Sequence, residues 1–205
     1  MKSFLIRPAL ALALAAGLAG CGGSDKAEFV VGGVVYNLAY PNLQLSTNGM
    51  TIDVAPPATL GDAVTYSFPN KLEYGDEYNV QITRQPLHQT CSLTSAYPTN
   101  ADTAGRLAQI NVQYNCTINP YLIGGTITGL TATGLVLANG STGGTVTPAK
   151  DATSYAFSLK VPYGQTYGVT VLTQPEGLTC TVANPTGMMG DADVTNISVS
   201  CVPRT

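Results

Sequence analysis

The sequence predicts an all-β protein made of two tandem copies of one unit, and three observations support this prediction. The first is a duplication, because residues 68–91 and 157–180 are identical at 10 of 24 positions without a gap. The second is a strand period, since apolar and polar residues alternate through segments such as 108–116. The third is composition: 10% of the residues are charged, while 22 are glycine and 13 are proline. This composition favours strands and turns over helices.

The first twenty residues have the layout of an export signal. Lys2 and Arg7 form a short positive region, an apolar run follows from Ala9 to Leu18, and small residues end at Cys21. The run is shorter than the roughly 20 residues that span a membrane comfortably. Small residues directly before a cysteine resemble the lipobox of bacterial lipoproteins. This resemblance implies cleavage before Cys21 and acylation of that cysteine, whereas an ordinary signal peptide followed by a chance cysteine is the alternative.

The lipobox resemblance also implies a location and an organisation. In bacterial lipoproteins, a residue other than Asp after the cysteine favours the outer membrane, and here that residue is Gly22. We therefore expect a lipid-anchored protein of the cell envelope, in the outer membrane, facing either the periplasm or the cell surface. The expected segments are a signal peptide at 1–20, a lipidated tether at 21–27, and β-sandwich units at 28–117 and 118–205.

Within each unit, the strands are expected in a repeated order. An early strand carries Gly32-Gly33 in one unit and Gly124-Gly125 in the other, where we expect a bulge or a crowded strand crossing. A middle strand follows around Tyr78 and Tyr167, and an alternating strand closes each unit. Typical turn pairs separate the strands at Asn48-Gly49, Pro56-Pro57, Gly61-Asp62, Gly75-Asp76, Asn139-Gly140 and Gly143-Gly144.

The cysteines predict one disulfide in each unit. Five cysteines are an odd number, and lipidation of Cys21 leaves an even set in an oxidising compartment. Each of the remaining four is in phase with the inward-facing residues of its strand. Four cysteines allow three pairings, but a duplicated unit should repeat its own bond, which gives Cys91–Cys116 and Cys180–Cys201. Zinc is disfavoured because the sequence has no Cys-x-x-Cys pair and a single histidine.

Residues 72–80 and 161–169 resemble the Leu-x-Pro-Gly-x-x-Tyr-x-Val stretch of fibronectin type III and other immunoglobulin-like domains. The resemblance implies two tandem immunoglobulin-like antiparallel β-sandwiches, with a tyrosine corner at Tyr78 and at Tyr167. Two strand-like segments follow the tyrosine strand here, where fibronectin type III has one. The strand order is therefore open, and a transthyretin-like sandwich also fits.

The second unit is also similar to a repeat found in bacterial lipoproteins and large surface proteins. The matching segments are 124–130, 167–180 and 199–201, with their Gly-Gly-Thr, Gln-Pro and Thr-Cys elements. This family is recognised by its architecture, and the resemblance implies extracytoplasmic modules without enzymatic activity.

The sequence offers no catalytic constellation, so we expect no enzyme, no cofactor and no metal. His88 is the single histidine and is expected in an exposed loop, while the acids are scattered. Asp191 and Asp193 fit a plain turn better than a calcium site, which needs 6–8 oxygen ligands. Removal of Lys2 and Arg7 leaves 7 basic against 12 acidic residues, which argues against nucleic acid as a partner.

The expected function is a non-catalytic structural or protein-binding and adhesion module, attached to the membrane by its lipid. Its expected partners are another envelope or surface protein, or a glycan. The first alternative is a carbohydrate-binding surface lipoprotein, which would need Tyr40, Tyr97 and Tyr155 to cluster as an exposed platform. The second is an accessory subunit of an envelope enzyme or secretion complex.

Overall fold

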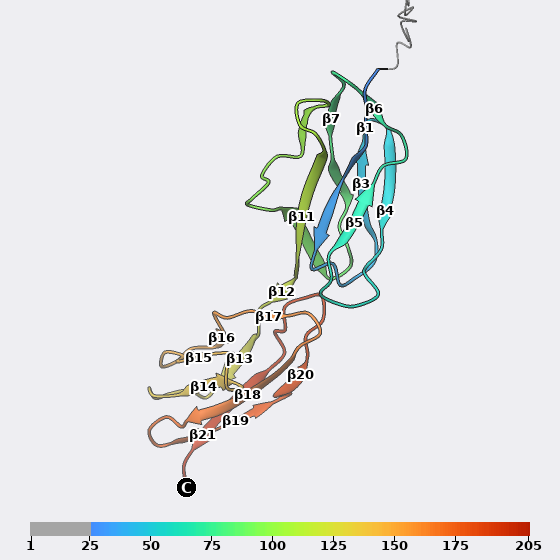
Figure 1. The fold of residues 1–205 in the computed structure, drawn as a ribbon. Helices are drawn as coiled ribbons and strands as arrows, with labels where there is room; N and C mark the ends of the chain where they lie inside the picture. Colours follow the sequence, from blue (N-terminus) through green and yellow to red (C-terminus); the bar gives the residue numbers. More distant parts are fainter. Residues whose placement is uncertain (1–25) are drawn as a thin grey trace, which may run out of the picture.

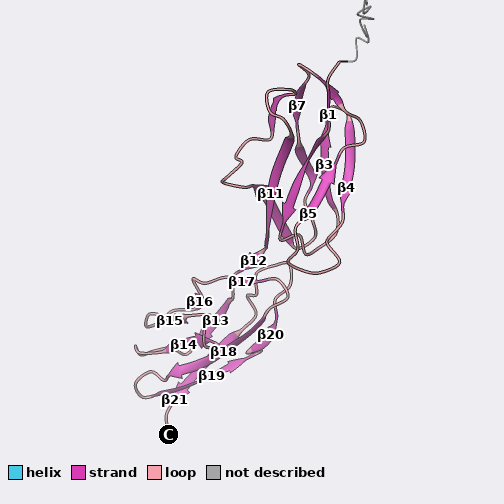
Figure 2. Ribbon diagram, in the orientation of Figure 1, coloured by secondary structure: helices cyan, strands magenta, loops and turns pink. Residues whose placement is uncertain are grey.

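The structure is a computed structural model that describes residues 26–205, so the expected signal peptide and Cys21 lie outside the described residues. The described chain forms two all-β units that lie end to end (Figure 1), and Figure 2 shows that strands and loops account for all of it. None of its elements is a helix long and apolar enough to cross a membrane.

The first unit consists of two facing sheets. The order of one sheet is β5 (Val64–Ser67), β2 (Val31–Tyr36), β11 (Ile110–Ile118), β9 (Gln89–Leu93). The order of the other is β4 (Met50–Val54), β3 (Leu43–Thr47), β8 (Gln81–Arg84), and β7 (Glu77–Asn79) continues β8 and pairs with β10 (Ala101–Thr103). A short pair of β1 (Glu28–Phe29) and β6 (Leu72–Glu73) lies at the end where the described chain begins.

The second unit repeats this topology strand for strand. One sheet has the order β16 (Ser154–Ala156), β13 (Gly124–Thr128), β21 (Ser198–Pro203), β19 (Leu178–Ala183). The other has the order β15 (Thr145–Val146), β14 (Val136–Asn139), β18 (Thr166–Thr173), β20 (Thr186–Met188), and β12 (Pro120–Tyr121) pairs with β17 (Val161–Pro162). The all-β class is therefore confirmed.

One pairing in each unit differs from the expected antiparallel arrangement. The first long strand lies parallel to the last, β2 beside β11 and β13 beside β21, and every other named pairing is antiparallel. This order also differs from the ABED and CFG sheets of an immunoglobulin constant domain. Alternation in sequence shows which face of a strand is buried but gives no strand direction, so this pairing was not predictable from the pattern.

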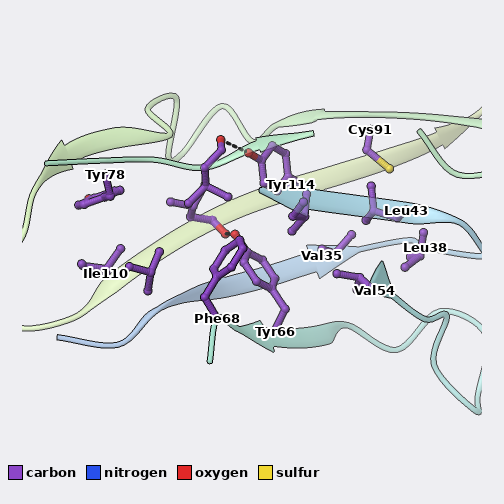
Figure 3. Packing of buried hydrophobic residues seen from close by; sticks show 14 of the residues in the cluster. Val35, Leu38, Leu43, Val54, Tyr66, Phe68, Tyr78, Cys91, Ile110 and Tyr114 are labelled. Carbon is purple, nitrogen blue, oxygen red and sulfur yellow. Dashed lines mark hydrogen bonds between the residues drawn. The ribbon is translucent and has the colours of Figure 1, made fainter. Parts of the chain in front are cut away.

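Each unit has its own hydrophobic core. The first core gathers buried residues from Val31 to Cys116, and the second gathers residues from Ile123 to Cys201. Figure 3 shows the interior of the first unit, where Tyr66 and Tyr114 lie among aliphatic side chains. Burial of this apolar surface from both sheets is the main stabilising contribution in each unit.

The second glycine of each Gly-Gly pair allows a tyrosine to cross its strand. Tyr66 is opposite Gly33 in the register, and its hydroxyl donates a hydrogen bond to Val112 O at 2.9 Å on the next strand. A Cβ on Gly33 would lie 1.8 Å from the same oxygen. The second unit repeats this arrangement with Gly125 and Tyr155, so the glycine pairs mark crowded strand crossings.

Both predicted disulfides are confirmed. Cys91 is directly opposite Cys116 on β9 and β11, and Cys180 is opposite Cys201 on β19 and β21. Each bond therefore ties the closing strand of a unit to its edge neighbour. The inward phase of all four cysteines agrees with their exposure, which is at most 6%.

The tyrosine corner that the resemblance suggested has a different form here. Among the described residues, the tyrosine hydroxyls that bond backbone carbonyls are those of Tyr66, Tyr114 and Tyr155. Tyr114 on β11 donates to Val80 O at 2.7 Å and thereby joins the two sheets of the first unit. Tyr78 is buried, and the hydroxyl of Tyr167 lies over Gly187 of the neighbouring strand.

Candidate functional site

The most elaborate polar and aromatic cluster of the described chain lies where the first unit meets the second. It is formed by Tyr40 and His88 of the first unit, Asn119 of the connection, and Tyr163 and Asp191 of the second unit. We call this cluster the joint. It contains one of the three tyrosines expected to bind a ligand and the histidine expected in an exposed loop.

The loop that carries His88 is built by the phrase that the sequence repeats. The Gln85 side chain accepts a hydrogen bond from Cys91 N at 2.8 Å and donates one to Cys91 O at 3.1 Å. Gln174 makes the same two bonds with Cys180, at 2.7 and 3.0 Å. The repeated glutamine thus closes a turn beside the first cysteine of each disulfide, which explains why Gln-Pro and Thr-Cys recur together.

His88 has a backbone conformation that is unusual for its residue type. Its φ is 57°, and the equivalent residue of the second unit is Gly177, with a φ of 69°. The left-handed region costs a residue with a Cβ roughly 1–2 kcal/mol, and glycine avoids this cost. A strained residue is a reason to look for a role of its side chain.

The imidazole ring of His88 is the centre of an aromatic cluster that spans both units. It stacks on Tyr163 with ring centroids 3.7 Å apart and an interplanar angle of 4°. Tyr40 approaches both rings edge-on, at 5.0 Å from His88 and 5.8 Å from Tyr163. Edge-on contacts like the two that Tyr40 makes stabilise by about 0.5–1.5 kcal/mol each beyond the area they bury.

A carboxylate of the second unit fixes the other side of the imidazole. His88 Nδ1 lies 2.7 Å from Asp191 Oδ1, so it donates a hydrogen bond and forms an ion pair whenever the ring is protonated. The nearby Asp193 accepts a hydrogen bond from Leu122 N at 2.7 Å. The two aspartates thus have separate structural contacts, and the described residues contain no cluster of ligands for a metal ion.

The connection between the units is bonded on both sides. Asn119 N donates to His88 O at 2.9 Å, and its side chain accepts from Thr90 Oγ1 at 2.7 Å. On the other side, Tyr163 N donates to Asn119 O at 3.0 Å. One residue therefore has hydrogen bonds to both units, which restricts the connection far more than its short length alone.

Buried Gln89 positions the loop that carries Tyr40. Its Oε1 accepts from Ala39 N at 2.8 Å and from Tyr40 N at 3.1 Å, while its Nε2 donates to Asn37 O at 2.8 Å. A buried side chain with three bonds to one loop fixes that loop firmly. Tyr40 is therefore held against His88 by the core of the first unit.

The three tyrosines proposed as a sugar platform are not brought together. Tyr40 belongs to the joint, and Tyr97 lies half-exposed on the loop between β9 and β10. Tyr155 is buried in the second unit, edge-on to Phe157, with its hydroxyl bonded to Ile197 O at 3.2 Å. The expectation that these three tyrosines form one exposed platform is therefore wrong, because Tyr155 lies on the inner face of β16.

Sequence reasoning did not identify the joint. The useful signal was the difference between the repeats at an otherwise matching turn, where His88 stands in place of Gly177. A side chain at a position that the repeat fills with glycine indicates a role for that side chain.

No protein-family model and no curated protein matches the chain. Among solved structures, it is similar to the Bacillus anthracis TIE protein, with 13% identity and a TM-score of 0.47, over 85% of this chain and 34% of that one. A Streptococcal ancillary pilin is similar at 14% identity and a TM-score of 0.30, over 88% of this chain and 64% of the pilin. The shaft pilin SpaA from Lactobacillus rhamnosus GG is similar at 10% identity and a TM-score of 0.30, over 87% of this chain and 99% of the pilin. The chain thus spans less than two thirds of the first two structures.

Proposed function

We propose that the protein is a non-catalytic, lipid-anchored stalk of the bacterial cell envelope that holds its second unit away from the membrane as a structural or protein-binding module. The observation that carries this proposal is the parallel pairing of the first and last long strands in each unit. Because these strands run in the same direction, the chain enters a unit at one end and leaves it at the other. Tandem units of this kind extend in line instead of folding back.

The joint supports the same proposal, because a stalk requires units that keep their relative orientation. Asn119 is bonded to both units, and the stacked rings of His88 and Tyr163 join the exit end of the first unit to the entry end of the second. At roughly 3.3 Å per residue, the nine residues of β11 give the first unit a length of about 30 Å, and the eight residues of β18 give the second about 26 Å. Two units in line would place the far end of the second well beyond the headgroup layer.

The anchor is tested with Cys21→Ser in the producing bacterium, compared with the unchanged protein. We expect the unchanged protein in the outer-membrane fraction, with an acylated N-terminus at Cys21 by mass spectrometry. The variant should lose acylation and leave the outer-membrane fraction, since a single acyl chain binds a membrane only marginally and stable anchoring needs more than one. Retention of an unacylated variant in the outer membrane would contradict the anchor.

Protease treatment of intact and lysed cells separates two forms of this function. Digestion of both units on intact cells would favour adhesion or contact with another surface protein. Protection until lysis would favour a partner within the periplasm, and the adhesion form would then be wrong.

A further inference from the structure

We infer that the entry end of the first unit is a second membrane contact, in which Tyr74 and Leu107 lie in the interfacial layer of the bilayer that holds acylated Cys21. The inference rests on the lipid anchor of the proposed function. We call the surface formed by residues 26–29, 71–76 and 104–108 the anchor end.

The equivalent surface of the second unit is a docking surface. Tyr74 corresponds to Tyr163, and both residues make the same backbone bond: Tyr74 N donates to Ala27 O, and Tyr163 N to Asn119 O, each at 3.0 Å. In the second unit, the ring of Tyr163 is covered by His88. At the anchor end, Tyr74 is 70% exposed, so the same ring has no such cover within the described chain.

Tyr74 is presented in a fixed position. A Cβ on Gly105 would lie 2.3 Å from Tyr74 Cδ2 and 3.3 Å from the Phe29 ring, so the tyrosine packs over the glycine beside this phenylalanine. Leu107, two residues further on, is 60% exposed. The Tyr74 ring packed over Gly105 and the exposed leucine two residues further along the same loop are apolar groups that need little ordering on contact.

The charges of the two equivalent surfaces differ in the direction that a membrane requires. Where the second unit has Asp191, Ala192 and Asp193, the first has Arg106, Leu107 and Ala108, when the two units are aligned on their closing cysteines, Cys201 and Cys116. The anchor end has therefore replaced two carboxylates with a cation and an alanine, and an alanine with a leucine. Tyrosine, leucine and arginine are typical of the membrane–water interface.

The charged side chains of the anchor end are paired, except for Asp76, whose carboxylate accepts a hydrogen bond from Glu73 N at 2.9 Å. Lys26 is bonded to Glu73, Lys71 lies 2.9 Å from Glu28, and Arg106 lies 3.1 Å from Asp102. Paired charges give no strong field toward anionic lipid. We therefore expect the contact to depend on apolar burial and to change little with salt.

The short tether indicates that the partner of the anchor end is the membrane. Five residue steps separate Cys21 from Lys26, which reach at most about 17 Å when extended. The anchor end must then stay near the headgroups. A second copy anchored in the same leaflet points its own entry end at the membrane, so its far end cannot cover Tyr74.

Because of the tether, a weak contact is enough to keep the anchor end at the bilayer. One tyrosine and one leucine bury too little surface to hold a free protein on a bilayer, but attachment raises their effective concentration at the interface to the millimolar range or above. The protein without its lipid should therefore not bind vesicles, whereas the anchored protein should have its anchor end in contact.

The test uses the mature lipidated protein in vesicles of phosphatidylethanolamine and phosphatidylglycerol, with a nitroxide on a single introduced cysteine. The test positions are Tyr74→Cys and Leu107→Cys. The controls are Leu60→Cys, which is 72% exposed at the joint end, and Tyr97→Cys, which is 49% exposed on the side of the unit. Collision rates with oxygen, which concentrates in the bilayer, and with a water-soluble nickel chelate are measured at each position after the disulfides are verified.

The inference predicts an oxygen-to-nickel ratio several-fold higher at positions 74 and 107 than at 60 and 97. It also predicts that Arg106→Asp together with Leu107→Ala, which copies the second unit, lowers the ratio at position 74 toward the control values. Protein that floats with vesicles but shows equal ratios at all positions would overturn this inference and leave the anchor intact. Protein that does not float would overturn the anchor and the inference with it. If the nitroxide at position 74 is shielded from the nickel chelate only at high protein density in the vesicles, its partner is another protein, and this result would also overturn the inference.

Discussion

At the residue scale, each unit depends on one glycine that allows a tyrosine ring and two strands to share a small space. Gly33 lies beneath Tyr66, and Gly125 lies beneath Tyr155, with hydroxyls bonded across the strand to Val112 O and Ile197 O. The sequence showed both glycine pairs and predicted crowding at them. It could not show which tyrosine causes the crowding, because the partner comes from a strand about 30 residues away.

Replacement of this glycine should destabilise its unit strongly. In Gly33→Ala, the new Cβ would lie 1.8 Å from Val112 O, so the strands must separate. We expect the free energy of unfolding of the first unit to fall by about 1–3 kcal/mol, as for overpacked core positions. The control is Gly168→Ala, a strand glycine whose Cβ would meet nothing closer than 3.7 Å. Urea unfolding of both variants checks this, and equal losses would contradict the account.

The buried tyrosines make stability dependent on alkaline pH. Burial raises the pKa of Tyr155 to about 12, above the ordinary value near 10. A raised pKa in the folded state means that the stabilisation is complete below about pH 10 and is lost as the pH rises toward 12. The free energy of unfolding of the second unit should fall across this window. Tyr155→Phe should lower stability by about 1 kcal/mol at neutral pH and make the alkaline loss smaller. If Tyr155→Phe loses as much unfolding free energy at alkaline pH as the unchanged protein, Tyr155 is not the cause of the loss.

At the scale of elements, the alternation predicted the strands and their buried faces, and it placed all four paired cysteines inward. What the alternation could not predict also has a physical reason. The parallel pairing of β2 with β11 depends on how the chain crosses between the sheets, and a period of two contains no such information. The tyrosine stretch of the first unit is divided into β7 and β8 at Val80, whose carbonyl oxygen accepts hydrogen bonds from the Tyr114 hydroxyl and the Asn100 side chain. Both partners come from other segments of the chain, and a period of two contains no information about them.

The two disulfides should stabilise their own units separately. The cysteines are 25 residues apart in the first unit and 21 in the second. Chain-entropy estimates for loops of this length give roughly 3 kcal/mol for each bond. Cys180→Ala with Cys201→Ala should therefore lower the unfolding free energy of the second unit by about that amount and leave the first unit unchanged. A matched replacement of Cys91 and Cys116 is the control, and an equal loss in both units from either pair would show that the units do not unfold independently.

At the scale of the whole molecule, the duplication predicted two units in tandem, at 28–117 and 118–205. The joint itself was not predictable, because its contacts join loops of different units. His88 was expected to be an exposed loop residue, whereas its side chain is 20% exposed and stacked on Tyr163. Sequence patterns describe the faces of strands well, but they do not describe which loops meet at the end of a unit.

We expect His88 to hold the two units in one relative orientation, and a distance measurement between the units by pulsed electron resonance checks this. Nitroxides are placed on exposed strand positions, Thr65→Cys in the first unit and Thr181→Cys in the second. The otherwise unchanged protein should give one narrow distance distribution. His88→Gly, which copies Gly177, should broaden it markedly while both units stay folded, because glycine also relieves the left-handed φ. A broad distribution with His88 present, or the same narrow distribution without it, would contradict the claim.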